Sequence, residues 1–416
     1  MLINRYLLII SLLFYTVLYS AASTTEVCES CDYNSIQDAV DNAISGDSII
    51  IKAGVYKEFA IRIEKEIHLI GEENSIIDGE NNGTIINVSA ENFSIKGLTI
   101  KNVGISYTKD YAAILVSRSK YFTIENNILR NVFFGILIEK SKYGLIRNND
   151  ISSSATHEAS SGNGVHLWHC SRMRIEQNKV SNLRDGIYLE FVENSSISNN
   201  ESSDNIRYGL HFMFSNNDEY FKNEFRNNGA GVAVMFSKII KMHHNTFHLN
   251  WGPASYGLLL KEITDADIEN NLFEKNTIGI NIDGCSRINY TNNHFVQNGW
   301  AIKFHGGCYE NIFELNNFIH NSFDLSYSSR LNDNKFEGNY WSDYNGYDLD
   351  KDGIGDVPYR PVRLFSYVVN KTPETLVLLR SLFVDIINFS EKVSPVFTPE
   401  NLIDNKPIMI RINDRN

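Results

Sequence analysis

Histidine and methionine side chains alternate with apolar ones in the segment Tyr208–Ser215, YGLHFMFS. Leu210 and Phe212 alternate with His211 and Met213, and a period of two is typical of a β-strand with one buried face. The other face therefore presents an imidazole and a thioether, which suit Cu(I) better than hard cations. The sequence leaves three interpretations of this face open: a copper site, a sugar-binding surface or an apolar docking patch.

Two cysteines, Cys28 and Cys31, form a C-x-x-C motif near the start of the chain. In an oxidising compartment this motif predicts a small local disulfide. Because thiolates are soft ligands, the same pair also suits Cu(I) or a redox role. Both interpretations stay open on the sequence alone.

An acidic segment, DLDKDGIGD, has the spacing of a calcium-binding loop. Carboxylates occupy its first, third, fifth and ninth positions, and glycine occupies the sixth, as in such loops. The twelfth position holds tyrosine in place of the usual bidentate glutamate. The alternative is an acidic turn satisfied by its own backbone. The candidate calcium ligands are Asp348, Asp350, Asp352 and Asp356.

A repeat through the middle of the chain must position these side chains. Each period has an apolar residue, one or two asparagines, a linker, a glycine and an alternating strand, as in SISNNESSDNIRYGLHFMFS. The spacing of the marker asparagines runs from 22 residues (127 to 149) to 29 residues (149 to 178), and such a period indicates a solenoid. The markers are Asn127, Asn149, Asn178, Asn200, Asn223, Asn245, Asn271, Asn293, Asn317 and Asn339.

The periods contain short runs rich in Ile, Val, Phe and Leu and no long helical pattern. The sequence therefore predicts an all-β fold, a right-handed parallel β-helix with about one coil per 22 residues. The segment SIQDAVDNAISG predicts a helix that caps the first coil. TPETLVLLRSLFVDIINFSEKV predicts an amphipathic C-terminal helix, which is interrupted by charge and is therefore not a membrane span.

Stacking the coils in register arranges the outward side chains in columns about 4.8 Å apart. One column contains His166, Tyr188 and His211, and the next contains Trp168, Glu190, Met213 and Met235. We take His166, His211, Met213 and Met235 as candidate copper ligands. We take Tyr188, Glu190 and Trp168 as candidate partner contacts.

A carbohydrate-binding or polysaccharide-cleaving β-helix protein is the alternative. Glu139 and Glu190 share a column two coils apart, about 9.6 Å by strand spacing. This separation is at the edge of the range of about 6.5–9.5 Å for an inverting pair of carboxylates. Trp168 lies between them, where its ring could stack on a sugar.

The first 22 residues combine a basic residue, a short apolar run and small residues, which predicts a signal peptide and export to the periplasm. The net charge of −12 argues against nucleic acid as a partner. The predicted organisation is a signal peptide (1–22), an N-terminal cap with the first strand (23–60), β-helix repeats (61–340), a calcium-loop-like segment (341–360) and a docking segment (361–416).

The chain as a whole resembles the periplasmic NosD family. The resemblance rests on SIQDAVDNAISGDSIIIKAGVYKE, on IHLIGEENSIIDGENNGTII with SIKGLTIKN, on the Asn/Gly coils and, most specifically, on GNYWSDYNGYDLDKDGIGDVPYRP. The coils alone would fit any carbohydrate-binding and sugar-hydrolysis (CASH) repeat protein. No family motif singles out His211 or Met213, so their assignment rests on the columns.

The resemblance implies a maturation protein of nitrous oxide reductase that has no catalytic activity of its own. The implied partners are the reductase, an ABC transporter with its ATPase and membrane subunit, and a copper chaperone lipoprotein. Together they would assemble the copper–sulfide centre of the reductase. The implied location is the periplasm, with membrane association through the transporter.

Overall fold

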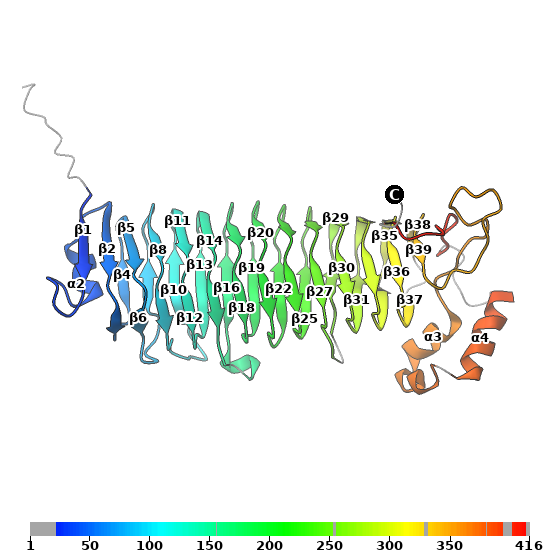
Figure 1. The fold of residues 1–416 in the computed structure, drawn as a ribbon, viewed down its shortest axis with the longest axis horizontal. Helices are drawn as coiled ribbons and strands as arrows, with labels where there is room; N and C mark the ends of the chain where they lie inside the picture. Colours follow the sequence, from blue (N-terminus) through cyan, green and yellow to red (C-terminus); the bar gives the residue numbers. More distant parts are fainter. Residues whose placement is uncertain are drawn as a thin grey trace, which may run out of the picture.

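The computed structural model describes residues 22–412 except Ala155, 253–254, 328–331, Arg380 and 394–401. The predicted signal peptide lies outside the described residues apart from Ala22. The described chain is an elongated stack of short parallel strands (Figure 1), in which each coil contributes strands to three sheets. The predicted parallel β-helix is therefore confirmed.

In the described residues the three sheets hold fourteen, twelve and thirteen strands. The fourteen-stranded sheet contains β1 (Thr24–Val27), β2 (Asp47–Ile51), β5 (Ile67–Gly71), β8 (Ser94–Lys96), β11 (Lys120–Glu125), β14 (Lys142–Arg147), β17 (Arg174–Glu176), β20 (Ser196–Ser198), β23 (Glu219–Phe221), β26 (Lys241–His243), β29 (Thr264–Glu269), β32 (Ser286–Thr291), β35 (Cys308–Glu314) and β38 (Asn332–Glu337).

The twelve-stranded sheet contains β4 (Ile61–Ile63), β7 (Ile86–Val88), β10 (Ala112–Ser117), β13 (Phe134–Glu139), β16 (Asn163–Trp168), β19 (Asp185–Glu190), β22 (Tyr208–Met213), β25 (Ala230–Met235), β28 (Leu258–Lys261), β31 (Ile278–Asp283), β34 (Trp300–His305) and β37 (Phe323–Tyr327).

The thirteen-stranded sheet contains β3 (Gly54–Tyr56), β6 (Ser75–Asp78), β9 (Thr99–Lys101), β12 (Ile128–Arg130), β15 (Asp150–Ser152), β18 (Lys179–Ser181), β21 (Glu201–Ser203), β24 (Glu224–Arg226), β27 (Thr246–His248), β30 (Leu272–Glu274), β33 (His294–Val296), β36 (Asn317–Ile319) and β39 (Tyr340–Trp341). Pairing starts at β1, ahead of the predicted repeat region.

The core runs along the inside of the coils. Because the coils are in register, identical positions stack, and one buried aromatic column is formed by Phe225, Phe247, Phe273, Phe295, Phe318 and Trp341. Full burial of each such side chain contributes roughly 2–3 kcal/mol. This regular core holds the outer side chains of each coil at fixed spacing.

An asparagine ladder follows one inner turn. Each side-chain amide donates to the side-chain oxygen of the asparagine one coil further on, from Asn127 to Asn339. The sequence assigned Asn317 to this column, but the ladder uses Asn316. The ladder residue directly precedes the strand of the thirteen-stranded sheet, and β36 begins at Asn317.

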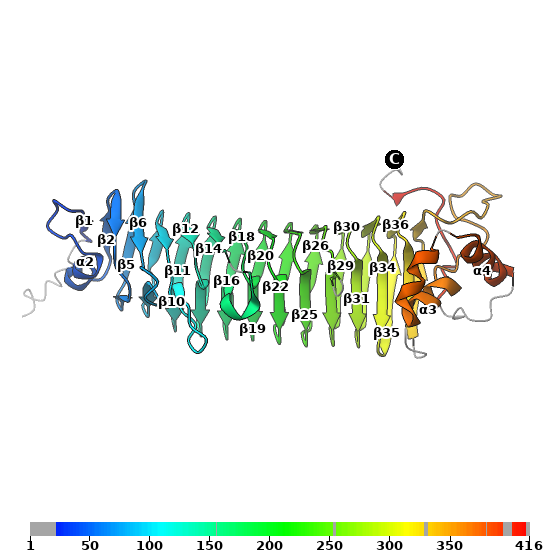
Figure 2. The same cartoon turned by 90° about the horizontal axis from the view of Figure 1, so that it is seen from below.

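Helices cover the two ends of the solenoid (Figure 2). At the N-terminal end lies α2 (Ile36–Asn42), whose N-cap Ser35 accepts from the amide of Asp38. The insertion after β15 contains the 3-10 helix η1 (Glu158–Ser160).

At the C-terminal end the predicted single helix is divided into the 3-10 helix η2 (Pro373–Leu378) and α4 (Leu382–Val393). A helix that the sequence did not predict, α3 (Leu364–Lys371), packs Phe365 and Val369 against Trp300 and Phe323. It therefore covers the end of the twelve-stranded sheet.

Candidate functional site

Strand pairing places the candidate side chains in the predicted columns of the twelve-stranded sheet. His166 pairs with Tyr188, and Tyr188 pairs with His211. The next column contains Trp168, Glu190, Met213 and Met235 in successive coils. The register that the sequence predicted is therefore confirmed.

The first column is a stack of rings. The ring centroids of His166 and Tyr188 lie 4.7 Å apart, and those of Tyr188 and His211 lie 4.5 Å apart. Tyr188 thus separates the two imidazoles by two coil spacings, about 9.6 Å. The sequence grouped His166 and His211 as ligands of one copper site. Because nitrogen ligands lie only about 2 Å from a bound metal ion, this arrangement does not bring the two histidines to one ion.

His211 is buried, although the alternation predicted that it faces outward. Its exposed fraction is 6 % because it packs between Tyr188 and the ring of Tyr208, whose centroid is 4.8 Å away. Among the described residues neither ring nitrogen has a hydrogen-bond partner. Nδ1 lies 3.6 Å from Oδ2 of Asp185. A buried imidazole without a direct hydrogen bond is rare in folded proteins.

Asp185 provides a fixed negative charge beside this imidazole. Arg207 donates to both of its oxygens, at 2.9 and 2.6 Å. Burial raises the pKa of Asp185, but its contacts with His211 and Arg207 outweigh burial and leave the pKa below its usual range. A buried carboxylate therefore lies beside the His211 ring.

His166 is held in its neutral form. Burial lowers the pKa of His166 to about 4, and the charge of Arg184 adds to this effect. Both ring nitrogens lack a hydrogen-bond partner within the described chain. Neutral imidazole is the form that binds metal ions.

Met213 and Met235 are half-buried neighbours in the second column. The Met213 sulfur lies 3.6 Å from the hydroxyl of Tyr188, and its strand also holds His211. Imidazole and thioether are donors of the right type for Cu(I). The column thus fits copper by donor chemistry and does not form a closed coordination shell.

A second surface borders these columns at the turn that follows the twelve-stranded sheet. The rings of His169, Phe191, Phe214 and Phe236 stack at centroid distances of 4.6, 5.2 and 5.2 Å. The three phenylalanines are 38–39 % exposed, and all four rings line one open groove. We call these four residues the aromatic turn column.

The aromatic turn column was not among the predicted site residues. The signal was present, since each ring lies five residues after the glycine of its coil. These turn residues have left-handed backbone, with φ of 51–53°, a conformation that is unusual for phenylalanine. Exposed stacked rings at such positions indicate a contact surface.

The carboxylates of the carbohydrate interpretation keep their predicted places. Glu139 pairs with Trp168, and Trp168 pairs with Glu190. However, the ammonium of Lys140 lies 4.8 Å from the centroid of the Trp168 ring. This cation occupies a ring face that sugar stacking would use.

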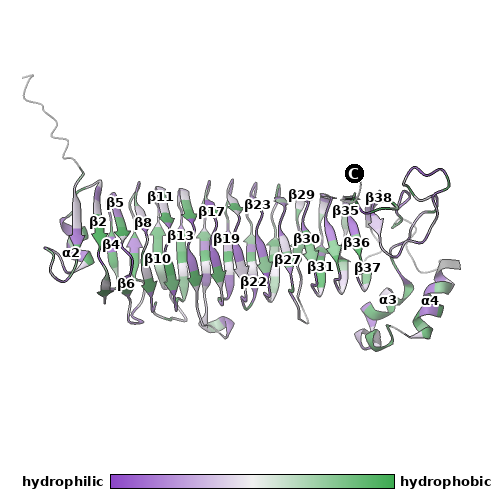
Figure 3. Ribbon diagram, viewed as in Figure 1, coloured by the Kyte–Doolittle hydropathy of each residue, from purple (hydrophilic) through white to green (hydrophobic). Residues whose placement is uncertain are grey.

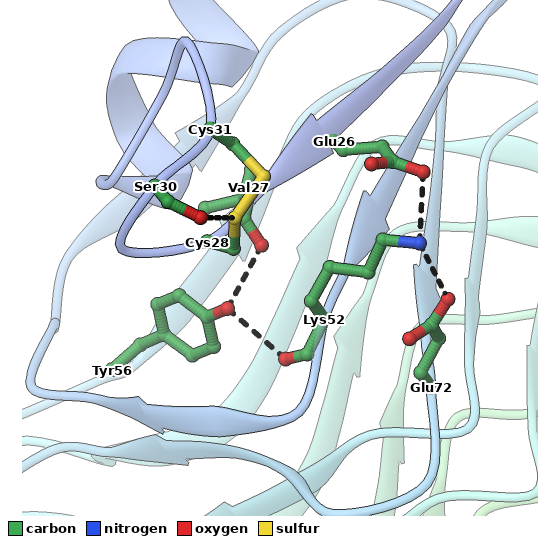
Figure 4. The surroundings of a disulfide bond; sticks show 8 residues. All are labelled: Glu26, Val27, Cys28, Ser30, Cys31, Lys52, Tyr56 and Glu72. Atoms are coloured by element: carbon green, nitrogen blue, oxygen red, sulfur yellow. Dashed lines mark hydrogen bonds and ion pairs between the residues drawn. A yellow bond between two sulfur atoms is a disulfide. The ribbon is translucent and has the colours of Figure 1, made fainter.

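Cys28 and Cys31 form a disulfide with a Cα–Cα distance of 5.0 Å (Figure 4). Next to it, the hydroxyl of Tyr56 donates to the carbonyl oxygens of Val27 and Lys52 at 2.8 and 3.0 Å. Of the two interpretations, the structure contains the disulfide. In this bonded form the sulfurs are not thiolates, and copper ligation by the pair would require reduction.

The acidic loop brings ligand atoms of Asp348, Asp350 and Asp352 within 4.8 Å of one another. The loop's own amides bind its carboxylates: Asp348 accepts from Lys351 and Gly353. This is the arrangement of the self-satisfied acidic turn. Calcium binding by the loop, with Asp356 as the fourth ligand, stays a prediction.

The helix α4 contains both hydrophobic and hydrophilic residues (Figure 3), and its apolar side is exposed. Leu382, Phe383, Ile386 and Phe389 are 57–74 % exposed. The opposite side is turned inward and includes Asn388 and Glu391, of which Glu391 is buried. Such an orientation favours docking on an apolar partner. Among the described residues, none of the helices has the length and hydropathy for a membrane crossing.

Comparison with known families agrees with this architecture. Residues 40–161 and 151–346 match the family model described as "Periplasmic copper-binding protein (NosD)". The chain belongs to the NosD family. NosD-family proteins are periplasmic by this description.

Two relatives of this NosD-family chain are named "Probable ABC transporter binding protein NosD". The protein from Stutzerimonas stutzeri is 27 % identical over 380 residues, which cover 86 % of each chain. The protein from Pseudomonas aeruginosa is 28 % identical over 366 residues, which cover 83 % of this chain and 85 % of the relative.

Solved structures share the fold. A double mutant of the periplasmic alginate epimerase AlgG has a TM-score of 0.52 at 13 % identity, over 75 % of this chain and 82 % of the epimerase. The Dettilon tailspike protein has a TM-score of 0.53 at 13 % identity, over 73 % of this chain and 62 % of the tailspike. At this identity the likeness concerns the β-helix architecture alone.

Proposed function

We propose that this chain is a non-enzymatic periplasmic accessory protein for the maturation of nitrous oxide reductase. Its partners are an ABC transporter, which consists of a membrane subunit and an ATPase, and a copper chaperone lipoprotein. Together they assemble the copper–sulfide centre. The observation that carries the proposal is the NosD family match over residues 40–346.

The geometry supports a scaffold. Imidazole and thioether donors, half-buried methionines and exposed stacked rings lie on adjacent columns of one face. The apolar face of α4 lies at the C-terminal end and offers a docking surface for the membrane subunit. A rigid β-helix keeps the two surfaces at a fixed separation.

Deletion of the gene tests the role. We expect the reductase to be produced without its catalytic copper–sulfide centre, and we expect the intact gene to restore that centre. A reductase that acquires the complete centre in the deletion strain would contradict the proposal.

Copper is the proposed cargo at His211 and Met213, with Met235 beside them. The double variant His211→Ala, Met213→Leu removes both donor types from one strand. We expect weaker Cu(I) binding by the isolated protein. Unchanged binding rejects this copper site and leaves the assembly role intact.

Carbohydrate cleavage is the second candidate, and it rests on the column Glu139–Trp168–Glu190. Its test is a glycan screen of the parent protein and of the variants Glu139→Gln and Glu190→Gln. Cleavage that both substitutions abolish would replace the accessory role with an enzymatic one.

A further inference from the structure

Two adjacent histidines on the fourteen-stranded sheet lie in position to bind one metal ion. His243 is the last residue of β26, and His244 follows at the turn toward β27 with φ of 57°. Their Nδ1 atoms are 3.1 Å apart. Two nitrogen ligands of a tetrahedral ion, each about 2.0–2.1 Å from it, lie about 3.3 Å from each other. The pair therefore needs little movement to hold an ion.

The ring of His243 is fixed from two sides. It stacks on Phe221 with a centroid distance of 5.0 Å and an interplanar angle of 7°. Its Nε2 lies 3.0 Å from Oε1 of Glu219. Because the carboxylate only accepts, Nε2 carries the proton and Nδ1 presents its lone pair. A carboxylate behind a metal-bound histidine is a regular feature of metal sites.

The ring of His244 completes the pair. In the metal-free protein its Nδ1–H donates to the lone pair on Nδ1 of His243. Metal binding transfers that proton to Nε2 of the same ring, so the ring stays neutral and Nδ1 becomes the second ligand. His244 is exposed, which leaves the pair accessible from solvent.

The site stays open on its outer side. Within the described chain, no third histidine, cysteine, aspartate or glutamate forms a compact group with the pair. Glu269 lies in the next coil and is the strand partner of His243. Its side chain is exposed and lies on the same side of the sheet as the histidine pair. Two protein ligands and open positions suit an ion that is taken up and released.

We propose that His243 and His244 form a copper-binding site on a different sheet from the His211 column. Imidazole suits copper, and Cu(II) has the highest affinity among the divalent first-row ions. The place of this site in copper handling rests on the proposed function, whereas the binding itself does not.

The test is Cu(II) titration of the purified chain against a competing chelator, with electron paramagnetic resonance to detect nitrogen ligands. His244→Asn keeps the turn, because Asn199 and Asn270 occupy the same position with φ of 55° and 54°. We expect His244→Asn and His243→Gln each to weaken binding at least tenfold and to reduce the number of coordinated nitrogens. Glu219→Gln, which leaves both ligands in place, weakens it about tenfold.

His248→Gln is the matched control, since this histidine contacts Glu274 at 3.1 Å outside the pair. We expect it to bind Cu(II) like the parent protein. Unchanged affinity in both His243→Gln and His244→Asn, or an equal loss in His248→Gln, would overturn the site. If these variants lose copper while gene deletion leaves the reductase centre intact, the proposed function fails and the site stands.

Discussion

Asp404 ends the asparagine ladder by accepting from Asn339. Its Oδ2 accepts from the backbone amide and the side-chain amide of Asn339 at 2.9 and 3.1 Å, and from the indole of Trp341 at 3.0 Å. Its Oδ1 accepts from the amide of Gly338. A residue from the C-terminal segment thus satisfies donors that another coil would otherwise satisfy, and it closes the polar end of the solenoid.

Asp404→Ala leaves these donors buried without an acceptor. We expect a loss of roughly 4 kcal/mol in the free energy of unfolding, measured by denaturant titration. Lys406→Ala is the control, because it removes the exposed side-chain ion pair with Glu337 and keeps the backbone amide that donates to Asp404. It should change stability by less than about 1 kcal/mol. Equal stability of the two variants would show that the ladder needs no terminal acceptor.

The repeat explains why so much of the fold was predictable. Gly209 and the asparagines defined the register, and the register placed Met213 beside Met235. Asp404 was not predictable because it is 65 residues from its partner Asn339. The burial of His211 was also not predicted. Alternation predicts which side of the sheet a side chain faces, but it does not predict whether neighbouring rings cover that side chain.

The buried carboxyl of Asp324 in β37 makes stability depend on pH. Burial raises the pKa of Asp324 to about 6 from 3.8. The folded state therefore binds this proton more tightly than the unfolded state, and stability falls as the pH rises from about 4 to about 6. At pH values above this range, the free energy of unfolding is lower by about 3 kcal/mol.

Asp324→Asn removes this titration. We expect the variant to be more stable than the parent at pH 7 and the difference to vanish below about pH 4, measured as unfolding midpoints across that range. Asp204→Asn is a matched surface control, since Asp204 is exposed. A difference between Asp324→Asn and the parent that stays constant with pH would contradict the assignment.

The disulfide Cys28–Cys31 closes a short loop at the N-terminal cap. Loop-closure entropy for four residues corresponds to about 2 kcal/mol. We expect the double variant Cys28→Ser, Cys31→Ser to lose about this much stability in oxidising buffer and to match the reduced parent. Copper affinity should not change, and a loss of copper binding in the variant would assign thiolate ligands to this pair.

The aromatic turn column provides the sharpest test of partner binding. Phe214 stacks on Phe191 and Phe236 with centroid distances of 5.2 Å to each. Phe214→Asn removes the central ring and suits the left-handed backbone, because asparagine tolerates this conformation. We expect a stability loss of about 1 kcal/mol and, by analogy with interface hot spots, at least about tenfold weaker binding of the partner reductase.

Leu249→Asn is the matched control for this substitution. Leu249 is also apolar, is 38 % exposed and has φ of 55° in the turn that follows β27 of the thirteen-stranded sheet. The two substitutions therefore make the same chemical change on different edges of the solenoid. Pull-down and calorimetric titration with the purified reductase measure the effect. If the reductase binds through the aromatic turn column, only Phe214→Asn weakens its binding. Equal binding by both variants would place the contact elsewhere.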